Sequence, residues 1–129
     1  MIQEHKELLF KDLSARLSYH VRLKVWLKDG TTEEGFLDLK HNYGDVLRDA
    51  FYYNEIIDIK PYLFPLSSMT KEEWEDYQKI RMIDWVHGDI NGTFINASLI
   101  VDWLNAHHFD YRNLINKNLA IDCTNLNIY

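Results

Sequence analysis

The chain has 129 residues, a formal net charge of −6 and a single cysteine. This length is typical of one domain around one core, so we expect residues 1–129 to form a single domain. The 20 Asp and Glu residues outnumber the 14 Lys and Arg residues, which weighs against binding to nucleic acid through its phosphates. The lone cysteine excludes an intramolecular disulfide. Because the sequence shows neither a signal peptide nor an apolar stretch of about 18 residues, we expect a cytoplasmic protein without a membrane span.

The first predicted element is an amphipathic helix over residues 3–17. Leucines recur at spacing four, at Leu9, Leu13 and Leu17, and this spacing places them on one face of a helix. The opposite face is not basic, so we expect the stripe to pack on a sheet and not on a membrane surface.

Four short strands are predicted in the next part of the chain, within residues 21–59. They cover residues 21–28, residues 31–39, a short stretch from residue 46 and residues 51–59. The first alternates apolar and polar residues, as half-buried antiparallel strands do. Asp29-Gly30 indicates a hairpin turn, and Gly35 indicates a bulge in the return strand. Four short strands joined by tight turns predict either a small antiparallel sheet or an SH3-like partial barrel.

The remaining chain is predicted to be mainly helical. Pro61 and Pro65 favour an extended segment that leaves the sheet, and Thr70 with Glu73 fits a capping box. The elements expected after the box are a helix over 71–85, a loop over 87–92, a helix over 96–107, a short helix or turn over 113–117 and a loosely held tail over 123–129. The predicted class is therefore α+β, a sheet packed with an N-terminal helix and two to three C-terminal helices.

Three segments resemble a known family. They are residues 11–17 (KDLSARL), residues 59–70 (IKPYLFPLSSMT) and residues 102–112 (DWLNAHHFDYR), the last continuing to residues 119–122 (LAID). Together they are similar to a family of short uncharacterised proteins that phages, prophages and mobile elements of gut bacteria encode. The resemblance covers most of the chain's framework, and residues 21–58 match the family less clearly. It implies a phage or mobile-element setting in a bacterial cytoplasm, and it implies no mechanism.

The richest polar cluster in the sequence is the candidate functional cluster His107, His108, Asp110 and Arg112. A histidine near an aspartate could act as a general base with its orienting group, and an arginine could hold an anion. The alternative is structural. A histidine at a helix C-terminus interacts with the helix dipole, and Asp110 would cap the following turn. Adjacent helical histidines point about 100° apart, which favours the structural alternative.

No other pattern in the sequence indicates a cofactor, a metal site or a nucleophile. The histidines are scattered, with no His-x-x-x-His pair to join the single cysteine, so we expect no metal. Neither a Gly-x-Ser-x-Gly motif nor a phosphate-binding glycine loop is present, so we expect no cofactor. Cys123 lies in a polar segment where nothing lowers its pKa.

A candidate interaction surface is indicated by the aromatic residues Trp26, Tyr43, Tyr52 and Tyr53. Exposed rings on a small barrel could stack on single-stranded bases, but the nearby carboxylates disfavour a phosphate backbone. Trp26 lies on the polar side of its strand, where it could mark a homo-oligomer interface. The acidic residues 72, 73, 75, 76 and 84 suit either a solvated face or a contact with a basic host surface.

We therefore expect a small non-catalytic accessory protein that acts through protein–protein interaction. The expected partner is a host or phage protein. One alternative is a nucleic-acid-binding accessory factor that uses the small barrel. Another is an enzyme centred on His107, His108 and Asp110. The absence of catalytic motifs favours a function other than catalysis.

Overall fold

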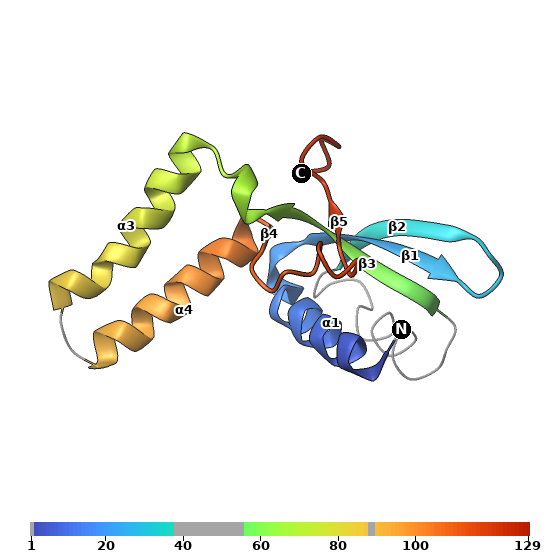
Figure 1. The fold of residues 1–129 in the computed structure, drawn as a ribbon, viewed down its shortest axis with the longest axis horizontal. Coiled ribbons are helices and arrows are strands. Elements are labelled where there is room, and N and C mark those ends of the chain that lie inside the picture. The colour runs from blue at the N-terminus through green and yellow to red at the C-terminus, as the bar shows by residue number, and fades with distance from the viewer. Residues whose placement is uncertain (1, 38–55, 88–89) are drawn as a thin grey trace.

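The computed structural model describes residues 2–37, 56–87 and 90–129. Its elements in chain order are α1 (Gln3–Ala15), the 3-10 turn η1 (Leu17–Tyr19), β1 (Val21–Leu27), β2 (Thr32–Leu37), β3 (Ile56–Pro65), the 3-10 turn η3 (Leu66–Ser68), α3 (Lys71–His87), α4 (Ile90–Ala106), β4 (Phe109–Asp110) and β5 (Ile121–Asp122). The predicted α+β class is confirmed. Figure 1 shows α1 beside the sheet, with α3 and α4 projecting together from one end of the molecule.

The hairpin between β1 and β2 forms where Asp29-Gly30 predicts it. The amide of Gly30 donates to the carbonyl of Leu27 at 3.0 Å, and the amide of Leu27 donates to Thr31 at 2.8 Å. Gly30 has a φ of 89°, a conformation that a residue without Cβ adopts at little cost. Asp29 accepts hydrogen bonds from both the amide and the hydroxyl of Thr31. A local turn signal therefore sets the register of this strand pair.

The predicted bulge at Gly35 is wrong. Gly35 pairs with Leu23 within an unbroken antiparallel register. The register shift lies elsewhere, between Trp26 and Leu27 in the pairing of β1 with β3. Gly35 is exposed, and an added Cβ there would meet no atom within 4 Å.

The extended segment around the two prolines stays in the sheet, contrary to prediction. Pro61 pairs with Leu23 of β1, and β3 then runs on to pair in parallel with β4 and with β5. The sheet is therefore open and mixed, in the order β2-β1-β3-β4 with β5 also paired to β3. The antiparallel part matches the predicted small sheet, and the described strands do not close into an SH3-like barrel. The predicted strand from residue 46 lies outside the described residues.

One hydrophobic core holds α1 against the sheet. Of the predicted helix stripe, Leu9 and Leu13 are fully buried, and Leu17 packs on the core from η1. The chain's last residues also pack against the sheet, whereas a loosely held tail was predicted. Cys123 is 1% exposed, and the Tyr129 hydroxyl donates to the carbonyl of Tyr62 at 2.8 Å. A side chain anchored in this way fixes the segment that carries it.

The helical hairpin of α3 and α4 begins at the predicted capping box. The amide of Thr70 donates to the Glu73 carboxylate at 2.9 Å, and the amide of Glu73 donates to the Thr70 hydroxyl at 3.1 Å. This reciprocal pair satisfies two amides that the first turn leaves unbonded. α4 begins at Ile90, six residues before the predicted start. Residues 90–92, which were predicted as loop, therefore belong to the helix.

Candidate functional site

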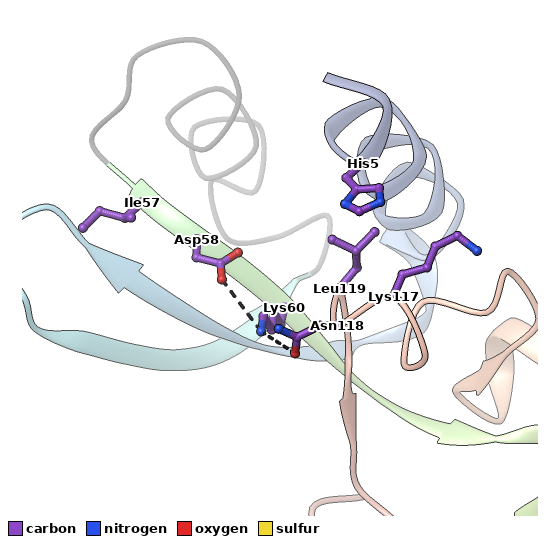
Figure 2. Close-up of a pocket in the computed structure, with 7 residues that line it drawn as sticks. All are labelled: His5, Ile57, Asp58, Lys60, Lys117, Asn118 and Leu119. Atoms are coloured by element: carbon purple, nitrogen blue, oxygen red, sulfur yellow. Dashed lines mark hydrogen bonds and ion pairs between the residues drawn. The ribbon is translucent and has the colours of Figure 1, made fainter. Parts of the chain in front are cut away.

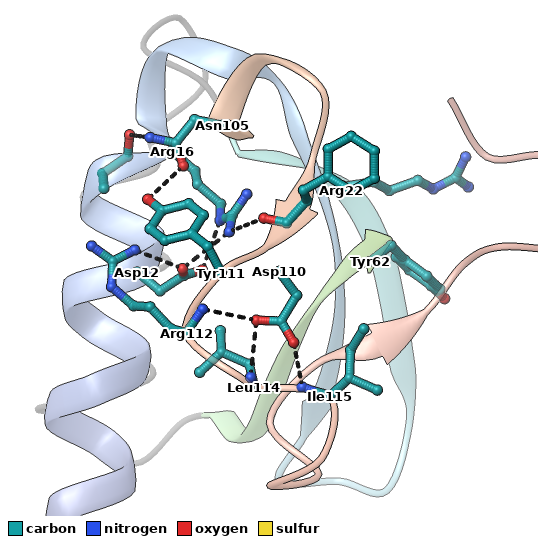
Figure 3. Close-up of polar contacts among 12 residues, drawn as sticks. Asp12, Arg16, Arg22, Tyr62, Asn105, Asp110, Tyr111, Arg112, Leu114 and Ile115 are labelled. Atoms are coloured by element: carbon teal, nitrogen blue, oxygen red, sulfur yellow. Dashed lines mark hydrogen bonds and ion pairs between the residues drawn. The ribbon is translucent and has the colours of Figure 1, made fainter. Parts of the chain in front are cut away.

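Residues 11–17 and 102–112, two segments far apart in the sequence, meet in a buried polar network between α1 and the chain after α4 (Figure 3). Asp12 and Arg16 lie one helical turn apart on α1, and both side chains are fully buried. The Arg16 Nε donates to Asp12 at 2.8 Å, and its Nη2 donates to the backbone carbonyl of Phe109 at 2.7 Å. The remaining Nη1 is buried without a hydrogen-bond partner among the described residues. Arg16 therefore ties α1 to β4.

Residues after α4 complete this network. The Arg112 guanidinium donates to the second oxygen of Asp12 at 2.9 Å, so one carboxylate serves two arginines. The Tyr111 hydroxyl donates to the Asn105 side chain at 2.8 Å. The Arg16 and Arg112 guanidiniums lie 5.1 and 4.6 Å from the centre of the Tyr111 ring, within cation–π range. Both cations are therefore held by a carboxylate and an aromatic ring of the same chain.

Asp110 caps the turn that follows it, as the structural alternative predicts. Its carboxylate accepts hydrogen bonds from the amides of Leu114 and Ile115 at 2.9 Å each, and from the amide of Arg112 at 3.3 Å. Asp110 is 7% exposed. A carboxylate engaged by backbone amides on both oxygens has a structural role that explains its burial.

The structure does not bring His107 and His108 together. The His107 ring is exposed, stacks on Trp103 with ring centres 4.1 Å apart, and its Nδ1 lies 2.9 Å from the Trp103 carbonyl. The His108 ring stacks instead on Tyr129, at 3.7 Å. His108 has a backbone φ of 61°, and this left-handed conformation turns the chain away from the axis of α4. The candidate cluster is thus divided among three separate environments.

Burial lowers the pKa of His108 to about 4, and the nearby Arg16 charge adds to the effect. An unfolded histidine has a pKa of about 6.5, so the unfolded chain binds the proton first. We expect the free energy of unfolding to fall as pH drops from about 6.5 to 4, by at most about 1.4 kcal/mol per pH unit from this residue. Asparagine tolerates the positive φ of this position, so His108→Asn is the suitable variant. In urea unfolding, its free energy of unfolding should fall less steeply over this pH range than that of His107→Asn. Equal slopes for both variants would contradict the assignment.

Cys123 is unsuited to act as a nucleophile. Its thiol is buried, and burial raises its pKa to about 11. The thiolate is the reactive form of cysteine, and a raised pKa leaves very little of it at neutral pH.

The predicted interaction surface is only partly within the described residues. Trp26 is half-buried on β1, with the Lys24 and Lys60 ammonium groups 5.3 and 5.5 Å from its ring. Its ring is therefore flanked by cations of its own sheet. Tyr43, Tyr52 and Tyr53 lie outside the described residues.

A pocket of about 330 Å³ lies near the start of β3 (Figure 2). It is lined by His5, Ile57, Asp58, Lys60, Lys117, Asn118 and Leu119. The Lys60 ammonium is held by the Asn118 amide oxygen at 3.0 Å and lies 3.9 Å from the Asp58 carboxylate. Its charge is therefore already engaged within the chain.

The α3–α4 hairpin carries exposed apolar side chains that the sequence did not predict. Trp74 and Met82 on α3 are 50% and 59% exposed, and Leu99 and Val101 on α4 are 39% and 38% exposed. We call these four residues the hairpin surface. The apolar spacing in the sequence predicts a buried stripe on α4, made of Leu99, Ile100, Trp103 and Leu104. Of these four, only Leu104 is buried.

A row of aromatic rings links this surface to the body of the protein. The Trp74 and Tyr77 rings meet at a tilt with centres 5.9 Å apart, as do Tyr77 and Trp103 at 5.7 Å, and Trp103 stacks on Phe109 at 5.7 Å. Such contacts orient the hairpin relative to the sheet. The hairpin surface is therefore presented on a packed support.

No family model matches this chain, and no curated protein or solved structure is significantly similar to it. Within the described residues, no three His, Cys, Asp or Glu side chains are grouped so that they could hold a metal ion. Among the helices described, none combines the length and apolar character that crossing a membrane requires.

Proposed function

We propose that this chain is a non-catalytic protein-interaction module that binds its partner through the α3–α4 hairpin. The observation that carries the proposal is the hairpin surface itself. Two helices pack on each other, and among their described side chains four large apolar ones are exposed. Large apolar side chains left exposed on one projecting element are a feature of binding sites. In the phage or mobile-element setting that the resemblance implies, the partner is a host or phage protein.

The charge of α3 supports a protein partner. Glu72, Glu75 and Asp76 are exposed on this helix near Trp74. A tryptophan surrounded by charged groups resembles the centre and rim of a protein interface, where aromatic anchors contribute most of the binding free energy. The same carboxylates would repel a phosphate backbone, which counts against the nucleic-acid alternative on this face.

The contacts of the candidate cluster count against the enzyme alternative. Asp110 binds backbone amides and Arg112 binds Asp12. His107 and His108 lie against different aromatic rings. A base and its orienting carboxylate must lie within hydrogen-bond reach of each other, and these groups have other partners.

Affinity capture from host lysate tests the proposal, with three tagged forms of the chain. They are wild type, the double variant Trp74→Ala/Leu99→Ala, and the matched control Ile57→Ala, which removes an apolar side chain that is 62% exposed on β3. We expect wild type and the control to recover the same protein whether or not nuclease is added. The double variant should recover at least about tenfold less, because an aromatic anchor contributes roughly 2 kcal/mol or more.

Two results would overturn the proposal. Equal recovery by the double variant would show that the hairpin surface is not the binding site. Recovery that disappears with nuclease would move the function to nucleic acid.

A further inference from the structure

The outward face of α3 carries two stripes of exposed side chains on either side of Gln78. Trp74 and Arg81 are seven residues apart and form one stripe, and Glu75 and Lys79 are four residues apart and form the other. Side chains at these spacings share a face of a helix. All four are exposed. Each stripe therefore joins an electron-rich or anionic group to a cation.

Each stripe is complementary to the same stripe on a second copy of the helix that runs in the opposite direction. An antiparallel copy of α3, related by a two-fold axis, meets each stripe with the same stripe in the opposite direction. Trp74 then faces Arg81 of the second copy, and Glu75 faces Lys79 of the second copy. In such a symmetric interface every contact occurs twice. The Trp74–Arg81 pairing is centred midway between residues 77 and 78, and the Glu75–Lys79 pairing is centred on residue 77. The two centres differ by half a residue, so a single axis can serve both pairings.

The proposed pairs match known interactions. An arginine over a tryptophan face is the stronger kind of cation–π contact, and the Arg81 guanidinium already lies 5.7 Å over the Tyr77 ring on that side of the helix. The second pair joins an exposed carboxylate to an exposed ammonium. Met82, 59% exposed, adds apolar area to the same face. Figure 1 shows α3 at the outer edge of the molecule, where a second helix can approach it.

We propose that α3 pairs antiparallel with α3 of a second copy of this chain. The inference rests on the proposed function, since it names the partner for the α3 part of the hairpin surface. Leu99 and Val101 of α4 lie off the pairing face and stay available to a different protein. Dimer formation is measured on the purified chain alone, and Leu99→Ala alone tests capture without changing the pairing face, so one proposal can fail without the other.

The test is analytical ultracentrifugation of the purified full chain at several concentrations. Wild type is expected to form dimers. Glu75→Lys and Lys79→Glu each place like charges at both ion-pair positions of a homodimer, and Trp74→Ala removes both cation–π contacts. Each should weaken dimerisation at least tenfold. The control Asp76→Lys makes the same charge change as Glu75→Lys at the neighbouring position, which points away from the pairing face, and should leave the dimer intact.

Mixing the two charge variants identifies the pairing. In a mixed dimer the new lysine of one chain faces the new glutamate of the other, and the unchanged Lys79 faces the unchanged Glu75. We expect equimolar Glu75→Lys and Lys79→Glu to form a heterodimer although neither forms a homodimer. Interactions within one helix do not change on mixing, so only contact between chains explains this result. A monomeric wild type, or variants that do not recover on mixing, would overturn the proposal.

Discussion

Replacing Arg16 with methionine should lower the free energy of unfolding by about 3–5 kcal/mol, the usual cost of breaking a buried ion pair. The substitution leaves the Asp12 carboxylate, which is fully buried, with one arginine in place of two. It also removes the donor to the Phe109 carbonyl. A buried polar group that loses its partner keeps the cost of its lost hydration. Urea unfolding at pH 7, followed by circular dichroism, measures the difference.

Two further variants separate the ion pair from general disruption of the core. Arg112 binds the same carboxylate, but its side chain is 19% exposed, so Arg112→Met should cost much less. The double variant Asp12→Leu/Arg16→Met removes both buried charges and should recover a large part of the lost stability. A cost below about 1 kcal/mol for Arg16→Met would contradict the described network.

Replacing Asp110 with alanine should cost about 2–4 kcal/mol of stability. Three backbone amides lose their acceptor, and those of Leu114 and Ile115 make the shorter hydrogen bonds. Hydrogen bonds to a charged group contribute about 1.5–3 kcal/mol each, and part of this is regained from water. Thermal unfolding gives the loss, and amide hydrogen exchange should show faster exchange at residues 114 and 115. Asp110→Asn keeps one acceptor oxygen and should cost less.

This substitution also separates the two interpretations of the candidate cluster. A structural cap predicts lost stability in proportion to the lost hydrogen bonds. A catalytic carboxylate predicts a variant with normal stability, because residues specialised for chemistry commonly contribute little to it. An Asp110→Ala protein as stable as wild type would contradict the structural role.

The parts of the fold that the sequence predicted depend on local chemistry. The Asp29-Gly30 turn and the Thr70–Glu73 box each need only residues within a few positions of each other. The parts that it did not predict depend on distant partners. β4 and β5 are two residues long and exist because they pair with β3. The segment around Pro61 stays in the sheet because it pairs with Leu23, which lies 38 positions earlier in the chain.

The same distinction applies to the sites. The Asp12–Arg16 pair was visible as an aspartate and an arginine at spacing four beside the buried Leu9 and Leu13 stripe, but its contact with Phe109 spans 93 positions. Periodicity shows which residues of α4 share a face. It cannot show whether that face is covered, and this is why Leu99 was expected to be buried.

Crosslinking in cells tests the central claim most directly. A photoreactive amino acid is placed at position 74 or 99 on the hairpin surface, or at position 57 on β3, which is more exposed than either, and the adducts are identified by mass spectrometry. If the hairpin binds a protein, positions 74 and 99 should form protein adducts and position 57 should not. Absence of adducts from both hairpin positions, or equal adducts from position 57, would contradict the claim.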